Sequence, residues 1–459
     1  MRRNRVAGWG TALALVVGAA CTGAEDPGPR RADPEPPNVL VILTDDQRAR
    51  GALDVMPKTR RWFGRDGTTY AEAFATTPLC CPSRASILSG RYSHNTGVEK
   101  NQDGPVLDQR STIEAYLRDS GYRTALVGKF LQGLGNDYNP PHFDGWVTSS
   151  WGYYGATFNV NGKLREIDRY STDYVSRWAA TYLRRFERTD ERPWLLYVAP
   201  VAPHKPYEPE EIYADAPVPE LSLDPSYEEV DRSDKPFFAD DMDFPVSQAR
   251  ALHRDQLRAL MSVDDMVGRL FRLLGKLGER DETLAFFLSD NGFLLGEHRM
   301  FAKRVPYIPA VRIPMLARWP GHIEAGATDN RMVANIDVAP TIFDAAGIEP
   351  HDRFPVDGLS LLSDETRDEL LIEIYDNWRQ HIPDWASILS PSFQYTEYYR
   401  RGYEERGARV MFREYYNLEG DPFQLDNLLA DDDDSNDPDV EALSSRLADY
   451  RTCEGESCP

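Results

Sequence analysis

The sequence predicts an α/β sandwich, followed by a smaller C-terminal subdomain with an antiparallel sheet and a helix. Several continuous apolar runs, each followed at once by polar or charged residues, are typical of strands buried on both faces of a sheet. Between them lie segments in which apolar residues recur every three to four positions, as in helices that pack on a sheet. Strands that alternate with helices favour a layered α/β domain. At 459 residues, 41% of them hydrophobic, the chain is long enough to bury a large core.

Residues 1–21 have the layout of an export signal. Three arginines precede an apolar run from Thr11 to Ala20 that is too short to span a membrane. The run ends in G-A-A-C, which is similar to the cleavage box of bacterial lipoproteins, with Cys21 as the lipidated residue. Simple cleavage after a small residue is the alternative, and both remain open. We therefore expect an exported protein, either extracellular or a cell-surface lipoprotein anchored to the membrane through Cys21, with residues 22–37 as a linker.

The larger domain is predicted to span residues 38–365 and to begin with a buried strand. Residues 38–47 read N-V-L-V-I-L-T-D-D-Q, so continuous aliphatic residues lead directly to Asp45 and Asp46. Ligands of open α/β sheets bind at the carboxyl ends of the strands. The two aspartates are therefore candidate site residues.

The same pattern recurs later in the chain. Further strands are predicted at residues 123–130, 194–200 and 283–292, and the last of these ends in Asp290 and Asn291. Intervening helices are predicted at residues 111–120 and 256–277. The sequence thus places a second pair of oxygen-bearing residues at a strand end.

Two later segments differ from this alternation. Residues 205–247 are rich in proline and acidic residues, which is typical of a functional rim or lid, with a merely connecting loop as the alternative. Residues 366–459 contain strand-like segments rich in tyrosine and arginine and then a helix at 440–450, which predicts the C-terminal subdomain. In an exported protein, Cys453 and Cys458 of the polar tail are expected to form a local disulfide.

The charge of the chain restricts its partners. A net charge of -22 argues against nucleic acid, because binding a phosphate backbone needs a basic face. An anionic substrate would need a local basic pocket, which favours a small or terminal anionic group over a long polyanion.

Residues 79–91, L-C-C-P-S-R-A-S-I-L-S-G-R, carry the most specific motif. They contain Cys-x-Pro-x-Arg, four further residues and Ser-Gly, and only Cys80 has Pro82 and Arg84 at the required spacing. Proline suits the first turn of a helix, so Cys80 is predicted at a positive helix end, where a developing anion is stabilised. Arg84, one turn on, is predicted to point back toward it. The alternative, two cysteines that only fill the start of a helix, is disfavoured by the full motif.

The acidic pairs predict a metal site. Asp45 and Asp46 follow one predicted strand, and Asp290 and Asn291 follow another. Clustered carboxylates repel one another unless a cation lies between them, and an all-oxygen set suits calcium or magnesium better than zinc. For either pair alone, a turn or helix cap is the alternative.

The motif around Cys80 resembles the signature of the type I, formylglycine-dependent sulfatases. The resemblance extends from Asn38 to the final cysteines. The form C-C-P-S-R-A-S-I-L, the stretch N-I-D-V-A-P-T-I-F-D-A-A-G and the C-terminal cysteine pair look most like N-acetylglucosamine-6-sulfatases and related heparan sulfatases. The resemblance implies an alkaline-phosphatase-like α/β/α sandwich with a large mixed, mainly parallel sheet. Residues 38–365 would then be the catalytic domain.

The resemblance also implies the cofactors and the site residues. Cys80 would be oxidised to formylglycine (3-oxoalanine) by a formylglycine-generating enzyme, and one Ca²⁺ per chain would be bound by residue 80 with Asp45, Asp46, Asp290 and Asn291. A basic set of Lys129, His204 and Lys303 would contact the sulfate or the formylglycine, and with Cys80 and Arg84 these are the expected catalytic residues.

Three other positions bear on this assignment. Leu131 stands where many relatives have a histidine that touches the sulfate, a departure shared with the glucosamine group. His298 ranks below the basic set as an extra contact. His94 is predicted to stabilise the helix after the nucleophile rather than to react.

The implied function is that of a sulfuric ester hydrolase that releases inorganic sulfate from a sulfated carbohydrate, with the N-acetylglucosamine-6-sulfate type as the candidate substrate. A hydroxyl of hydrated formylglycine would attack the sulfur, and loss of the proton from the second hydroxyl would expel sulfate. Two alternatives remain open. One is a phosphonate or phosphate monoester hydrolase of the same superfamily, and the other is a lipoprotein that binds sulfated glycans without turnover.

Overall fold

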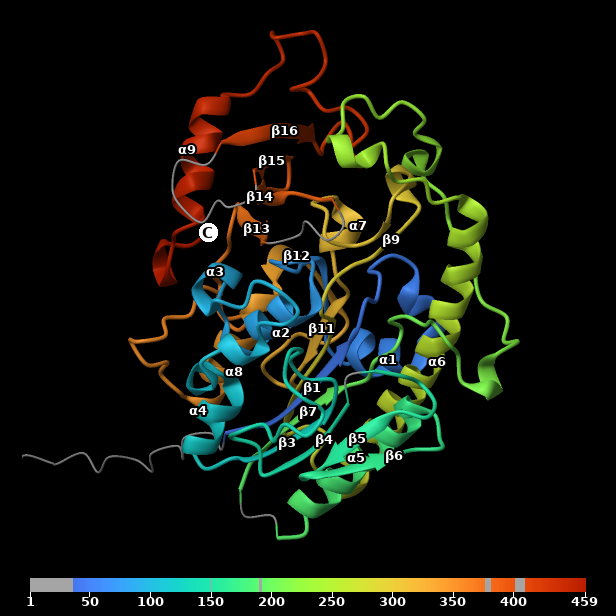
Figure 1. Ribbon diagram of the computed structural model, residues 1–459. Coiled ribbons are helices and arrows are strands. Elements are labelled where there is room, and N and C mark those ends of the chain that lie inside the picture. Colours follow the sequence, from blue (N-terminus) through green and yellow to red (C-terminus); the bar gives the residue numbers. More distant parts are fainter. Residues whose placement is uncertain (1–35, 150, 190–191, 376–380, 401–408) are drawn as a thin grey trace, which may run out of the picture. The chain divides into compact units, whose positions relative to one another are not determined.

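The computed structural model describes residues 36–459 apart from residues 150, 190–191, 376–380 and 401–408 (Figure 1). The predicted export signal with Cys21, and the linker up to residue 35, lie outside the described residues. In the part that is described, none of the helices combines the length and the apolar character needed to cross a membrane.

The predicted mixed, mainly parallel sheet is present (Figure 1). Strands β8, β1, β7, β3 and β4 run parallel to one another, and β12 is parallel to β2. Strand β11 is antiparallel to β8 and β2, and β5 is antiparallel to β4 and β6. In the described residues it has ten strands, in the order β12 (Ala327–Ala334), β2 (Thr68–Phe74), β11 (Met315–Arg318), β8 (Thr283–Ser289), β1 (Asn38–Thr44), β7 (Trp194–Ala199), β3 (Arg123–Gly128), β4 (Gly145–Thr148), β5 (Thr157–Val160) and β6 (Lys163–Glu166).

Helices cover both faces of this sheet. One layer contains α5 (Ser171–Phe186) and α6 (Val246–Leu277), and the other contains α2 (Cys80–Ser89), α4 (Ile113–Asp119) and α8 (Val338–Ala346). Strand β1 shows why: Leu40 and Ile42 pack in the first layer, and Val39, Val41 and Leu43 in the second. Because side chains alternate across a strand, a strand that is apolar throughout needs an apolar layer on each side.

Helix α6 begins at Val246 rather than at the predicted position 256. Its early turns pack through Ala249 on an apolar cluster that includes Leu221, Tyr227 and Phe293, instead of on the sheet. The helical pattern that faces the sheet therefore starts later than the helix itself. Residues 205–247 form mainly irregular chain with short 3₁₀ turns, at Glu211–Tyr213, Pro225–Glu228 and Phe237–Ala239.

The C-terminal part contains the expected antiparallel sheet. Its strands are β13 (Leu370–Ile374), β14 (Asp384–Leu389), β15 (Phe393–Tyr399) and β16 (Val410–Asn417). Helix α9 spans Val440–Tyr450, the bounds predicted from the sequence. Apolar side chains of these strands share one core cluster with β12 and with the short helix α7 (Ile308–Val311).

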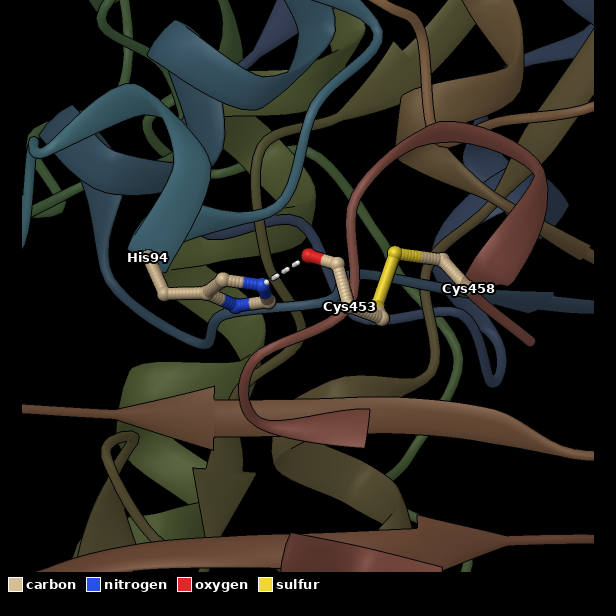
Figure 2. A group of neighbouring side chains, drawn as sticks. All are labelled: His94, Cys453 and Cys458. Atoms are coloured by element: carbon tan, nitrogen blue, oxygen red, sulfur yellow. Dashed lines mark hydrogen bonds between the residues drawn. A yellow bond between two sulfur atoms is a disulfide. The ribbon is translucent and has the colours of Figure 1, made fainter. Parts of the chain in front are cut away.

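The C-terminal tail contacts the segment that follows α2. Cys453 and Cys458 form the predicted disulfide. His94, in the short helix α3 (Ser93–Thr96), lies with its Nε2 atom 2.9 Å from the carbonyl oxygen of Cys453 (Figure 2). Its Nδ1 atom lies 2.9 Å from a carboxylate oxygen of Glu373. His94 thus has the structural position expected of it, and the two bonded sulfurs beside it are not metal ligands.

Candidate active site

The two acidic pairs lie side by side at the carboxyl edge of the sheet. In the parallel register of β1 and β8, Thr44 pairs with Ser289, the last residues of the two strands. Asp45 and Asp290 follow directly. The backbone N–H of Asp46 donates to Oδ1 of Asp290 over 3.1 Å, and the amide of Asn291 donates to Oδ1 of Asp46 over 2.8 Å. Neighbouring strand ends therefore assemble these four side chains.

Basic residues follow strands β3 and β7 at the same carboxyl edge of the sheet. Lys129 follows β3, and its backbone N–H donates to the carbonyl oxygen of Ala199 over 2.7 Å. The approach is close because Gly128 has φ +114° and a Cβ there would lie 2.0 Å from that carbonyl oxygen. Only glycine fits this position. His204 lies in the loop after β7 and is 5% exposed.

Cys80 is the first residue of α2, as the position of Pro82 predicted. Its side chain is buried, and its Sγ atom lies 3.5 Å from Oδ1 of Asp45. The amine of Lys303 donates to the same sulfur over 2.9 Å. A side chain at position 80 therefore meets a helix N-terminus, a lysine and the carboxylate group.

The structure brings together all the side chains predicted to bind a metal. A ligand atom from each of Asp45, Asp46, Cys80 and His204 lies within 4.8 Å of the others, and Asp290 and Asn291 are hydrogen-bonded to Asp46. His204 was predicted as a sulfate contact rather than as a ligand, and its Nε2 atom lies 3.7 Å from Oδ2 of Asp46.

Buried cations balance the three carboxylates. Arg84 donates from Nε to Oδ2 of Asp290 over 2.9 Å, and the amines of Lys129 and Lys303 pair with Asp45 and Asp46 respectively. Burial alone would raise the pKa of Asp45, but Lys129, His204 and Arg84 outweigh it and hold that pKa below its usual range. Burial would lower the pKa of Lys303, but the nearby Asp46 raises it above its usual range. Asp45 and Lys303 are therefore both charged at neutral pH.

The donor set fits a hard divalent cation. Asp45, Asp46, Asp290 and Asn291 offer carboxylate and amide oxygens, all at most 2% exposed. A positive charge already lies among them, because the Lys303 amine contacts Asp46 and donates to the amide oxygen of Asn291 over 3.2 Å. Calcium or magnesium suits such oxygens, whereas zinc prefers nitrogen and sulfur.

The same cluster offers donors to an anion. The Nη2 atom of Arg84 is buried without a hydrogen-bond partner in the described residues, 3.8 Å from Oδ2 of Asp45. A buried guanidinium N–H without a partner is costly, and an anionic oxygen would satisfy it. With Lys129 and Lys303 beside it, Arg84 forms the local basic pocket that the negative net charge requires for an anionic substrate.

His204 is oriented by its own loop. Its Nδ1 atom lies 2.9 Å from the carbonyl oxygen of Lys205, which accepts a hydrogen, so Nδ1 carries the proton and Nε2 faces Asp46. Burial lowers the pKa of His204, but Asp45 and Asp46 raise it to about 9. Trp151 packs against the imidazole edge to face, with ring centroids 5.1 Å apart.

A cleft of about 570 Å³ opens over this cluster. Asp46, Cys80, His204 and Lys303 lie in its wall. Most of the remaining lining was not predicted from the sequence: Asn101, Gln102, Gln132, Trp151, Lys205, Tyr207, Met242, Asp243, Phe244, Phe293, Arg299, Phe301, Ala302 and Arg304. Lys205 and Tyr207 from one end of the 205–247 segment and Met242 from the other take part, which is the placement expected of a rim. The signal for this rim was the proline-rich and acidic composition of residues 205–247.

Two positions lie apart from the cluster. The Nδ1 atom of His298 is 2.6 Å from a carboxylate oxygen of Glu229, and its ring packs on Tyr307, with centroids 4.5 Å apart. His298 lines a separate cavity with Arg48. Leu131 is buried in the apolar core and has no polar atom for a sulfate. Neither residue adds to the basic pocket.

Comparisons with known proteins agree with this geometry. A family model described as Sulfatase matches residues 37–348, and one described as N-sulphoglucosamine sulphohydrolase, C-terminal, matches residues 296–452. Human N-acetylglucosamine-6-sulfatase is 30% identical over 97% of this chain and 90% of its own length. A Drosophila melanogaster extracellular sulfatase SULF-1 homolog is 33% identical over 74% of this chain, which spans 32% of that protein. A solved structure of a protein in complex with its substrate, D-glucosamine-2-N,6-O-disulfate, aligns with 90% of this chain and 96% of that protein's chain. The TM-score is 0.76 at 23% sequence identity, so the two proteins have the same fold.

Proposed function

The chain belongs to the sulfatase family and hydrolyses sulfuric esters of sulfated carbohydrates, and we propose that it removes the 6-sulfate of a glucosamine residue through formylglycine at position 80 and one Ca²⁺. The similarity to human N-acetylglucosamine-6-sulfatase over nearly the whole chain supports this substrate class. The observation that carries the proposed chemistry is the convergence of Cys80, Lys303 and Asp46 in the wall of one cleft.

We assign the metal-binding role to side chains at two strand ends. Asp45, Asp46, Asp290 and Asn291 would hold the cation together with residue 80. When present, Ca²⁺ would neutralise sulfuryl oxygens, and formylglycine in its hydrated form would supply the attacking hydroxyl. The N-terminus of α2 stabilises negative charge that develops at position 80.

The basic side chains hold the sulfate group. Lys129 pairs with Asp45, and Lys303 pairs with Asp46. The Nη2 atom of Arg84, which has no hydrogen-bond partner in the described residues, offers a third position for an anionic oxygen. Donors fixed in advance stabilise the charge of the transition state without reorganisation. His204 is the proposed acid, because its Nε2 atom faces the cluster while Nδ1 is held by a backbone carbonyl. As an imidazolium, His204 has a second proton on Nε2, and that proton would go to the oxygen of the departing alcohol.

We further propose that the protein acts outside the cytoplasm, with residues 38–365 as the catalytic domain and residues 366–459 as the C-terminal subdomain. The layout of residues 1–21 supports export, and an extracellular sulfatase homolog supports the same location. A lipid on Cys21 and a maturation enzyme that oxidises Cys80 complete this proposal.

A sulfate-release assay on defined sulfated mono- and disaccharides, with calcium present, tests the proposed substrate. We expect release of inorganic sulfate from 6-sulfated glucosamine derivatives. Paired aryl sulfate and phosphate esters provide the control for reaction type. A large preference for the phosphate ester would replace the proposal with a phosphatase activity, and tight binding of sulfated sugars without turnover would replace it with a binding function.

A further inference from the structure

Trp151 and Lys205 lie together at the mouth of the active-site cleft, outside the catalytic cluster. The Lys205 amine is 5.9 Å from the ring centre of Trp151, and both side chains line the cleft. The indole of Trp151 is 50% exposed. A large aromatic surface beside a cation is therefore open to whatever enters the cleft.

Within the described residues, Lys205 lacks a carboxylate partner such as those of Arg299 and Lys303. Arg299 lines the same cleft and pairs with Asp243 over 2.6 Å. By contrast, the exposed Lys205 forms no ion pair within the described ranges of the chain, and its contact with Trp151 is a weak one at this distance. In a chain with a net charge of -22, a lysine beside the catalytic site that has no carboxylate partner is available for an anionic ligand.

The position of His204 shows which part of the substrate this pair would meet. His204 is the proposed proton donor to the departing alcohol, and in a sulfated sugar that alcohol is an oxygen of the sugar itself. Trp151 packs directly on the imidazole of His204, and Lys205 is the next residue in the chain. The sugar ring must therefore lie beside Trp151 and Lys205, while the sulfate lies against Arg84 and Lys303.

We propose that Trp151 and Lys205 form a sugar subsite that selects substrates with a second anionic group. Trp151 would pack on the apolar face of the sugar ring, and Lys205 would bind an N-sulfate on the same sugar or the carboxylate of a neighbouring uronic acid. This inference rests on the proposed function, and it narrows the substrate class to 6-sulfated glucosamines that carry a second negative charge on the same or the neighbouring sugar.

Steady-state kinetics with calcium test the subsite. The substrates are N-acetylglucosamine 6-sulfate, glucosamine 2-N,6-O-disulfate, a 6-sulfated glucosamine linked to a uronic acid, and an aryl sulfate. For Lys205→Gln we expect kcat/KM to fall about tenfold on one or both doubly charged sugars, through KM, and to change less than about threefold on the singly charged sugar. Whichever doubly charged sugar is affected identifies the source of the anion. Lys163→Gln, an exposed lysine on β6, is the matched control and should leave all rates at the wild-type value.

Trp151→Ala separates the aromatic contribution. We expect it to lower kcat/KM on all three sugars by about tenfold or more, with a smaller loss on the aryl sulfate. Equal losses on singly and doubly charged sugars in Lys205→Gln, or no loss, would overturn the proposed anion selection although the enzyme remains a sulfatase. If the wild-type protein releases no sulfate from any substrate, the proposed function itself fails. Because both side chains are exposed or at the surface of the cleft, unchanged melting temperatures are expected for both variants.

Discussion

The amine of Lys303 donates a hydrogen bond to the Sγ atom of Cys80 over 2.9 Å, although the two residues come from distant parts of the chain. The same amine also contacts Asp46 and the amide oxygen of Asn291. One lysine therefore connects the proposed nucleophile position with the proposed metal ligands. A negative charge that forms at residue 80 would be stabilised where it arises.

Replacement of Cys80 by alanine is expected to lower kcat on any sulfate ester by at least about 10⁴-fold, because no formylglycine can form. The neighbouring Cys81 gives a matched control. It is equally buried, and its Sγ atom lies 3.6 Å from the carbonyl oxygen of Gln132, away from the carboxylates. Cys81→Ala should therefore keep most of the activity. Comparable turnover by Cys80→Ala would exclude residue 80 as the nucleophile.

Removal of the divalent cation should abolish sulfate release and lower the melting temperature, since the cluster of Asp45, Asp46 and Asp290 would lose its ligand. At a Ca²⁺ concentration of 100 times Kd, binding stabilises the folded state by about 2.7 kcal/mol. The measurement is activity and thermal unfolding before chelation, after it, and after Ca²⁺ is restored. Asp290→Asn should raise the Ca²⁺ concentration needed for half-maximal activity, whereas Asp431→Asn, in an exposed acidic run, should not. Full activity in protein shown to be metal-free would contradict the proposed site.

His94 is expected to make stability depend on pH. Burial lowers its pKa, but Glu373 outweighs burial and raises the pKa to about 9, above the ordinary histidine pKa of 6.5. Between these pH values the folded state binds more protons than the unfolded state. The stabilisation of the folded state by protonated His94 is therefore complete below about pH 6.5 and is lost as the pH rises through 9. The stabilisation by the charge of His94 is at most about 3.5 kcal/mol.

Denaturant unfolding of the wild type and His94→Gln at pH 6 and pH 10 measures this contribution. The stability difference between the two proteins should shrink at the higher pH. His351→Gln changes an exposed histidine and serves as the control. A difference that stays constant across this range would show that the charge of His94 does not stabilise the tail contact.

Glu114 of α4 is expected to make the free energy of unfolding depend on pH over a lower pH range than His94. The side chain is fully buried, and burial raises its pKa to about 8 from 4.5. Between these values the unfolded state has lost its proton and the folded state has not, so stability falls as the pH rises from about 4.5 to 8.

The variant Glu114→Gln has no carboxyl at this position, so it should not lose stability in this way as the pH rises. Relative to the wild type it should gain about 3 kcal/mol of unfolding free energy between pH 5 and pH 8. Glu166→Gln, an exposed residue on β6, should show no such gain. Parallel pH profiles for the wild type and Glu114→Gln would mean that the carboxyl titrates in the folded protein as it does in water.

The strands that precede the metal ligands could be predicted because each contains a continuous apolar run, residues 39–43 and 284–288, and is soon followed by aspartate or asparagine. Asp45 and Asp290 were placed at one sheet edge on this basis. The nucleophile helix followed from the spacing of Cys80 and Pro82. Lys129, His204 and Lys303 came from the family resemblance, since nothing in their local sequence distinguishes them from solvated residues.

The parts that were not predicted lack a local signal. Strand β2 is only partly buried and mixes polar with apolar residues, and β11 has four residues, too few to show a period. Trp151 and Lys205 lie in loops, and tertiary contacts place them in the cleft. Helix α6 starts early because its first turns pack on irregular chain rather than on the sheet.

The most direct test of the central claim is the mass of the peptide that contains residue 80, isolated from active protein produced with a formylglycine-generating enzyme. The account predicts a residue lighter than cysteine by the change from thiol to aldehyde. Fully active protein in which every copy of this peptide carries an intact thiol would contradict it.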